Sequence, residues 1–196
     1  MSAHRFAVFH TAIGACGIAW GESGVVGVQL PEHRDHATRD RLRRRFSDAS
    51  EATPPPAIQQ AIDGIVALLH GEMRDLSFVM LDMQDVPPLR RSIYAVLRSI
   101  PAGATLSYGE VAARLGDGST ARDVGEAMGK NPFPIIVPCH RVVAAGGKLG
   151  GFSATGGVTA KLRLLNIEGA LVGEAPTLFD ALPLHAPPRP PSRTLR

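Results

Sequence analysis

The sequence predicts an α+β protein made of a strand-rich N-terminal domain and a helical C-terminal domain. Residues 5 to 30 hold three short segments rich in Val, Ile, Phe and Trp, separated by glycines, which is typical of β-strands. Beyond residue 88, apolar residues recur at helical spacing. The stretch between them, "DMQDVPPLR", has two prolines and little periodicity, which indicates a linker. We expect domains over residues 1–83 and 88–170, with residues 84–87 as the linker.

The N-terminal domain is expected to contain four strands and two helices. The segments "RFAVFH", "GACGIAWGE" and "GVVGVQL" are the first three strands, and "LSFVML" is a further one. One helix covers "DHATRDRLRRRF" and a second covers "PPAIQQAIDGIVALLHG". Prolines at positions 54 to 56 suit the entry to the second helix, and Gly71 suits its end. The apolar residues of that helix share one face: Ile58, Ile62, Ile65, Val66 and Leu69.

The C-terminal domain is expected to begin with a helix in "LRRSIYAVLRSIP" and to continue with two short helices joined by a turn. "LSYGEVAARLG" opens with a capping box, in which Ser107 is the cap and Glu110 follows three residues later. The turn "GDGST" leads into "ARDVGEAMGK", with Ser119 or Thr120 as its cap. Two short helices joined by a glycine-containing turn are typical of a helix-turn-helix.

The second of these short helices carries unusually small side chains. Its small residues are Ala121, Gly125, Ala127 and Gly129. Tight packing on a neighbouring helix is one explanation. The other is close approach of the helix backbone to a partner molecule, with Arg122 as the long cation at the helix start. The helix alone does not decide between them.

Composition limits the class of protein. The chain has 196 residues and 44% hydrophobic content, enough for a sizeable core. No apolar run approaches the ~20 residues of a membrane span, and the N-terminus lacks a secretory signal. Two cysteines without CxxC or HxxxH spacing indicate neither a disulfide framework nor a metal site. We expect a soluble, cytoplasmic, metal-free protein whose net charge of +3 permits nucleic-acid binding. The Pro/Arg-rich tail over residues 171–196 is expected to be flexible.

A cysteine and a histidine stand side by side in "PIIVPCHRV". Thiolate is the reactive form of cysteine, and histidine is the usual proton acceptor near neutral pH. Burial for packing alone is the alternative for Cys139, and it is the preferred interpretation of Cys16. Neighbours along an extended chain point to opposite faces, so a water or a turn at Pro138 would have to couple Cys139 to His140. The pair indicates nucleophilic catalysis.

A carboxylate would orient the imidazole and stabilise its charged form. Glu168 is the candidate, in the last turn of a helix over "TAKLRLLNIEGA" that ends at Gly169. A solvated helix end is the alternative for this residue. The inward residues of the helix are expected to be Leu162, Leu165 and Ile167. The preceding loop, "AAGGKLGGFSATGG", lacks the order of a phosphate-binding loop, and the "RDRLRRR" run is interpreted as a solvated helix face.

The stretch "NPFPIIVPCHRVV" closely resembles the active-site motif of the O6-alkylguanine-DNA alkyltransferases, also called methylated-DNA–protein-cysteine methyltransferases. The likeness covers most of residues 88 to 170, including "SYGEVAARLG", "ARDVGEAMG" and "LLNIEGA", and is looser over the first 83 residues. It implies a ribonuclease-H-like sheet domain followed by a winged helix-turn-helix-like domain that holds the site. Members bind duplex DNA in the minor groove, extrude the damaged guanine and transfer its O6-alkyl group irreversibly to their own cysteine.

The resemblance also implies roles for individual residues. Cys139 is the alkyl acceptor, His140 the base acting through water, and Glu168 the residue that orients it. Asn131 holds the turn around the site, and Tyr108 donates toward guanine N3. Substrate and DNA contacts are implied for Arg122, which fills the stack left by the base, and for Ala121, Gly125, Val142, Phe152 and Ser153. Phe152 stands where many members carry tyrosine, which puts the preference for alkyl size in doubt.

The implied partner is duplex DNA containing O6-alkylguanine, with O4-alkylthymine as a second substrate left open. The protein would act once, as a monomer, without cofactor or metal. Three alternatives stay open at this point. They are a non-enzymatic alkyltransferase-like lesion-binding protein, a helix-turn-helix regulator that reads sequence in the major groove, and a thiol hydrolase.

Overall fold

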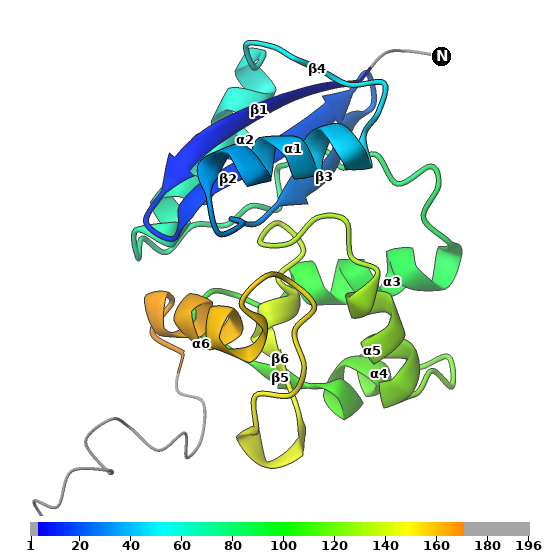
Figure 1. The fold of residues 1–196 in the computed structure, drawn as a ribbon. Helices are drawn as coiled ribbons and strands as arrows, with labels where there is room; N and C mark the ends of the chain where they lie inside the picture. Colours follow the sequence, from blue (N-terminus) through cyan, green and yellow to red (C-terminus); the bar gives the residue numbers. More distant parts are fainter. Residues whose placement is uncertain (1–3, 171–196) are drawn as a thin grey trace, which may run out of the picture.

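The computed structural model describes residues 4–170; residues 1–3 and the tail at 171–196, for which flexibility was expected, lie outside the described range. A sheet with two helices lies on one side of the molecule, and the helices that follow residue 88 lie on the other (Figure 1). The α+β expectation is confirmed. Among the described residues, no helix is both long and apolar enough to cross a membrane.

The N-terminal sheet has four strands in the order β3-β2-β1-β4. Neighbours β1 and β2, and β2 and β3, are antiparallel, whereas β4 runs parallel to β1. Glycines with φ of 126° and 124°, Gly14 and Gly24, begin the second and third strands, a conformation that favours glycine. The strands are β1 (Arg5–Thr11), β2 (Gly14–Gly21), β3 (Gly24–Gln29) and β4 (Ser50–Glu51).

Two helices cover the opposite faces of this sheet, α1 (Asp35–Arg45) and α2 (Pro56–Leu69). Successive side chains along β2 point to opposite faces of the sheet, as they do in any strand. Ala19 packs with Leu42 of α1, whereas Ile18 belongs to the larger core that includes α2. The buried residues of α2 are Ile58, Ala61, Ile62, Ile65, Leu68 and Leu69.

The strand expected at "LSFVML" is wrong. Residues 77 and 78 form a turn, and Leu81 alone makes an isolated bridge, to Val25. Asp75 accepts hydrogen bonds from the backbone N and the hydroxyl of Ser77, at 2.8 and 2.5 Å. Such side-chain bonds to a nearby backbone N–H compete with strand pairing, so the local turn prevails over the β-propensity of the segment.

The C-terminal part is helical, and its elements agree closely with expectation. Ser107 and Glu110 form the capping box of α4, and Thr120 rather than Ser119 caps α5. Gly116, with φ of 68°, ends α4. The helices are α3 (Pro88–Arg98), α4 (Tyr108–Leu115), α5 (Ala121–Gly129) and α6 (Gly157–Ile167). Two short strands, β5 (Leu106–Ser107) and β6 (Val142–Val143), pair in parallel.

The inward face of α6 differs from the expected one. Leu165 is buried as expected, but Leu162 and Ile167 are only half-buried. Their places in the core are taken by Leu164 and by Lys161, which is fully buried. Lys161, Leu164, Leu165 and Glu168 lie at the i, i+3, i+4 and i+7 spacing of one helix face.

The two parts of the molecule are joined by direct hydrogen bonds as well as by the linker. The backbone N of Val28 in β3 donates to the carbonyl of Pro132 at 2.9 Å, and Arg45 Nη2 donates to the same carbonyl at 3.0 Å. Thr155 donates to Glu32 at 2.8 Å. The N-terminal part therefore contacts both the loop that precedes Cys139 and the loop that precedes α6.

Candidate active site

Cys139 lies at the start of a 3₁₀ turn, η1 (Cys139–Arg141), which follows the loop over residues 130–138. Its side chain is buried, with 6% of the residue exposed. In the loop, Ile135 has φ of 74°, a left-handed conformation that costs a β-branched residue about 1–3 kcal/mol. The surrounding structure holds this strain and so fixes the path of the chain into the cysteine.

Asn131 closes this loop through both ends of its side-chain amide. Its Nδ2 donates to the carbonyl of Val137, and its Oδ1 accepts from the backbone N of Phe133, both at 2.9 Å. The Asn131 side chain also interacts with the Cys139 thiol and lowers its pKa. One residue thus holds the loop closed and favours the thiolate form of Cys139.

His140, Arg141 and Glu168 form a buried hydrogen-bonded group beneath the cysteine. His140 Nε2 lies 2.9 Å from Glu168 Oε1, and both side chains are almost fully buried. Arg141 contributes two bonds to the same carboxylate, Nε to Oε2 at 2.8 Å and Nη2 to Oε1 at 2.9 Å. Although burial alone would raise the pKa of Glu168, these bonds and charges lower it to about 2. Glu168 is therefore an ionised ion-pair partner, not a solvated helix end.

The tautomer of His140 follows from this contact. An ionised carboxylate only accepts hydrogen bonds, so Nε2 must carry the proton. Burial lowers the pKa of His140 more than Glu168 raises it, so the resting imidazole is neutral and Nδ1 holds a free lone pair. Within the described residues, Nδ1 is buried and has no hydrogen-bond partner. His140 can therefore accept a proton at Nδ1, the ring nitrogen that does not face Glu168.

The charge state of the thiol is set by opposing influences. Burial raises the pKa of Cys139, whereas Asn131 and the positive charge of Lys161 lower it. Lys161 Nζ donates to the carbonyls of Val142 and Leu149, and burial lowers its own pKa to about 8. Because burial is the largest influence on Cys139, the resting thiol is protonated and needs a base to react.

A cavity of about 290 Å³ opens beside the cysteine. Tyr108 forms one wall, and burial raises the pKa of its hydroxyl, so it remains a donor. A Cβ on Gly125 would come within 3.7 Å of the Tyr108 ring, and one on Gly150 within 3.4 Å. The cavity brings together Tyr108, Gly125, Met128, Gly129, Cys139, Gly151, Phe152 and Ser153. It is therefore narrow and partly aromatic.

Some expected site residues lie elsewhere. Ala121 and Arg122 are exposed at the start of α5 and do not line this cavity. Val142 is buried in β6, and its carbonyl accepts from Lys161. A carbonyl has two lone pairs, so this contact leaves one acceptor position. The structure brings Cys139, Tyr108, Gly125, Phe152 and Ser153 together and keeps Ala121 and Arg122 on the outer surface.

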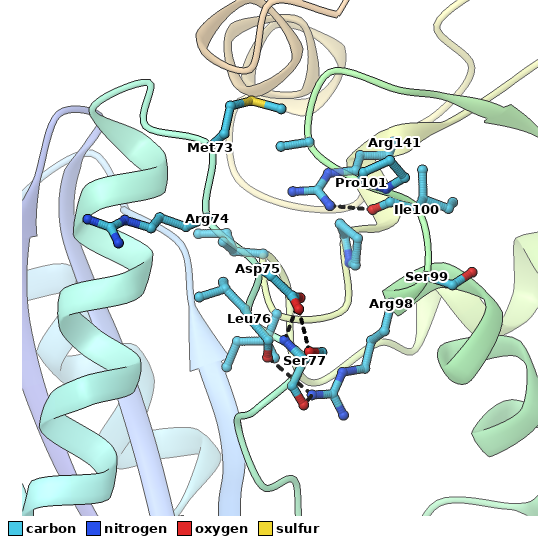
Figure 2. Close-up of a pocket in the computed structure, with 14 residues that line it drawn as sticks. Met73, Arg74, Asp75, Leu76, Ser77, Arg98, Ser99, Ile100, Pro101 and Arg141 are labelled. Carbon is cyan, nitrogen blue, oxygen red and sulfur yellow. Dashed lines mark hydrogen bonds between the residues drawn. The ribbon is translucent and has the colours of Figure 1, made fainter.

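A separate cavity of about 500 Å³ lies behind the nucleophile loop (Figure 2). Ile135 and Pro138 of the loop line it, together with the segment that follows α2. Arg141 donates to the carbonyl of Ile100, and Arg98 donates to the carbonyls of residues 76, 77 and 79. Arg98 thus ties the C-terminal half to the segment that follows α2, whereas Arg141 holds the site to the end of α3 within the C-terminal half.

Two residues of the site escape sequence reasoning, Arg141 and Lys161. Arg141 stands next to the Cys-His pair, but nothing in its position shows that it binds Glu168. Lys161 had a detectable signal, because it shares a helix face with Leu164, Leu165 and Glu168. Among the residues that the structure describes, no group of three or more His, Cys, Asp or Glu side chains gathers as a metal site.

Comparisons with known proteins identify the family of the chain. The family profile described as "6-O-methylguanine DNA methyltransferase, DNA binding domain" matches residues 88–170. The methylated-DNA–protein-cysteine methyltransferase of Mycobacterium tuberculosis is 42% identical over 162 residues, covering 81% of this chain and 96% of the relative. That of Methanothermobacter thermautotrophicus is 38% identical over 153 residues, 78% of each chain.

Solved structures show the same relationship. The crystal structure of M. tuberculosis OGT in complex with DNA has a TM-score of 0.68 and 32% identity, covering 84% of this chain and 92% of that one. The O6-methylguanine-DNA methyltransferase of Pyrococcus kodakaraensis has a TM-score of 0.64 and 26% identity, covering 84% and 99%.

Proposed function

The chain belongs to the family of methylated-DNA–protein-cysteine methyltransferases, which repair DNA by direct alkyl transfer to a cysteine of the protein itself, and we propose that Cys139 accepts the alkyl group of O6-alkylguanine in duplex DNA. The observation that carries the assignment to this cysteine is the buried group of Cys139, His140 and Glu168. His140 follows the nucleophile directly in the chain, and its free ring nitrogen faces away from an ionised carboxylate.

The reaction would begin with removal of the thiol proton. His140 Nδ1 takes this proton through a water molecule, and Glu168, bound to Nε2, stabilises the imidazolium that forms. Lys161 supplies positive charge beside the thiolate, because its Nζ is held near by two carbonyl groups. The nucleophile is thus generated inside the protein rather than at its surface.

Attack then occurs in line at the alkyl carbon. The Sγ–C bond forms while the C–O6 bond breaks, and the electron pair goes to the purine, which regains a proton to become guanine. Tyr108 supports this step as a donor toward N3, since its raised pKa keeps the hydroxyl protonated. Asn131 holds the loop that aims the sulfur. The thioether that results is stable, so each molecule acts once.

A base inside a duplex cannot reach a buried cysteine, so the damaged guanine must leave the stack. Extrusion costs a few kcal/mol. We propose that α4 and α5 form the helix-turn-helix that binds the minor groove, with Ala121 and Gly125 allowing close approach. Arg122 is exposed at the start of α5, a position from which it could enter the stack and offset part of the cost.

We also propose that the chain folds as a ribonuclease-H-like sheet domain followed by a winged helix-turn-helix-like domain. The strand order β3-β2-β1-β4, with β4 parallel to β1, supports a ribonuclease-H-like sheet domain. The pair α4 and α5, with β5 before it and β6 after it in one small sheet, supports a winged helix-turn-helix-like domain over residues 88–170.

Mass spectrometry tests the assignment directly. Incubation with an O6-methylguanine duplex should leave one methyl group on the peptide containing Cys139 and convert an equal amount of lesion to guanine. Cys16 offers a matched control, because burial raises the pKa of its thiol to about 12. Cys16→Ser should transfer normally, and Cys139→Ser should not. An unmodified Cys139 after the lesion has gone, or many lesions repaired per molecule, would refute the proposal.

A further inference from the structure

A second cavity, of about 250 Å³, also reaches Cys139. It shares part of its wall with the first: Met128, Gly129, Cys139, Phe152 and Ser153 line both. Whereas the first cavity extends toward Tyr108, the second extends toward the N-terminal domain and is lined there by Gln29, Glu32, Arg41 and Arg45. The cysteine therefore lies where two differently lined cavities meet.

The N-terminal wall of this cavity carries a positive charge excess. Arg45 donates to the carbonyls of Val28 and Pro132, both at 3.0 Å, and burial together with the charge of Arg41 lowers its pKa. Arg41 is exposed and makes no hydrogen bond or ion pair to any residue in the described range. Repulsion between two neighbouring guanidinium groups would be relieved by an anion placed between them.

The one carboxylate of this wall is already bound. Glu32 Oε1 accepts from Gln29 Nε2 at 3.3 Å, and Oε2 accepts from Thr155 Oγ1 at 2.8 Å. The Glu32 carboxylate offsets one of the two positive charges of Arg41 and Arg45. Both of its oxygens already accept hydrogen bonds from other side chains of the protein. Arg41 remains as a cation without a protein partner at the cavity wall.

In-line transfer of an alkyl group larger than methyl needs such a space. The sulfur, the alkyl carbon and O6 must lie close to one line at the moment of attack, so any atoms beyond the first carbon must leave that line sideways. A methyl group has no such atoms. If the base occupies the cavity beside Tyr108, the tail of a larger alkyl group requires room to the side of the line that joins O6 to the sulfur, and the second cavity also reaches Cys139.

We propose that the second cavity is a subsite for the tail of O6-alkyl groups larger than methyl, and that Arg41 and Arg45 favour tails ending in a carboxylate over neutral tails of the same shape. This inference rests on the proposed function and adds a substrate class to it. The chemistry is unchanged: the thiolate forms the S–C bond, the C–O6 bond breaks, and the tail stays on the cysteine as part of the thioether.

Matched pairs of lesions test the subsite. Duplexes would carry O6-methylguanine, O6-(ω-carboxyalkyl)guanines of two chain lengths, or the carboxamides of the same lengths. The measured quantity is the ratio of single-turnover rates, carboxylate over carboxamide, with transfer to Cys139 followed by mass spectrometry. We expect the ratio to reach about 3- to 5-fold at the longer length, the range of a partly solvated charge pair. Raising the salt concentration should lower it.

Arginine variants distinguish a specific effect of the second cavity from the electrostatic potential of the protein as a whole. Arg41→Gln should bring the ratio close to one, and Arg41→Lys should keep most of it. Arg44→Gln is the control, because it removes the same charge from the same helix at an exposed residue that does not line the cavity. Since each ratio is taken within one variant, changes in DNA affinity cancel.

Two outcomes would overturn the inference. One is a ratio near one in the wild type at both chain lengths, and the other is an equal fall in Arg41→Gln and Arg44→Gln. Measuring methyl transfer to Cys139 in the same experiment distinguishes failure of the subsite proposal from failure of the proposed function. Methyl transfer without a charge preference refutes the subsite alone, whereas no methyl transfer refutes both.

Discussion

Replacing Glu168 with glutamine should destabilise the protein and slow alkyl transfer for separable reasons. The carboxylate accepts bonds from His140 Nε2 and from Arg141 Nε and Nη2, all buried. Removing one partner of a buried ion pair typically costs 3–5 kcal/mol, because the other charge is left uncompensated. The shift of the Glu168 pKa from its ordinary value of 4.5 to about 2 independently corresponds to about 3 kcal/mol. We therefore expect Glu168→Gln to lose about 3 kcal/mol of unfolding free energy.

The pH dependence of this loss has a definite sign. Because the pKa of Glu168 is lower in the folded protein, its contribution is fully present above pH 4.5 and disappears as the pH falls toward 2. The difference in unfolding free energy between wild type and Glu168→Gln should therefore be constant near neutral pH and shrink below pH 4.5. Urea denaturation at a series of pH values measures it.

A double variant separates stability from chemistry. Adding Arg141→Met to Glu168→Gln removes the uncompensated guanidinium and should recover part of the lost unfolding free energy. It should not recover the rate of transfer, because His140 still lacks an ionised acceptor for Nε2. If the double variant regained both, Glu168 would act only through folding, and the role given to it in orienting the base would be refuted.

Three further predictions follow from the same geometry. His140→Ala should slow transfer at neutral pH and shift the pH–rate profile upward, because a buried thiol with a raised pKa loses its base; an unchanged profile would place the base elsewhere. Lys161→Met tests the buried ammonium, whose pKa in the folded protein is lowered from 10.5 to about 8. The unfolding free energy of the wild type should therefore rise relative to that of the variant as the pH increases from 8 to 10.5. Denaturation experiments that show no such rise would contradict this prediction. Arg122→Ala should impair repair of duplex DNA far more than reaction with free O6-benzylguanine, and equal losses in the two rate assays would count against entry into the stack.

The sequence predicts the local features of this protein well because their causes are local. The caps at Ser107 and Thr120 and the turn that begins at Gly116 depend on neighbours three or four residues away, which a sequence displays directly. The segment at residues 76–81 shows the limit of such reasoning. Its composition favours a strand, but the hydrogen bonds of Asp75 to Ser77 form a turn instead.

The site itself is only partly visible in the sequence. The Cys-His pair and Glu168 could be selected from chemistry and resemblance, but the 2.8 Å bond from Arg141 to Glu168 joins residues 27 positions apart. Nothing local predicts that contact. Lys161 shares an apolar helix face in the sequence, but a charged residue there is assumed to reach solvent, and only the carbonyls of Val142 and Leu149 explain why it does not.

The carbonyl of Pro132 accepts one hydrogen bond from β3 and another from α1. The linker predicted from the sequence therefore does not separate two independent folding units. The N-terminal part holds the loop that precedes Cys139 through these hydrogen bonds. Melting the sheet would release that loop at once. The two halves should accordingly denature in one concerted transition, and a severed C-terminal half should lose the fixed path of the chain into its nucleophile.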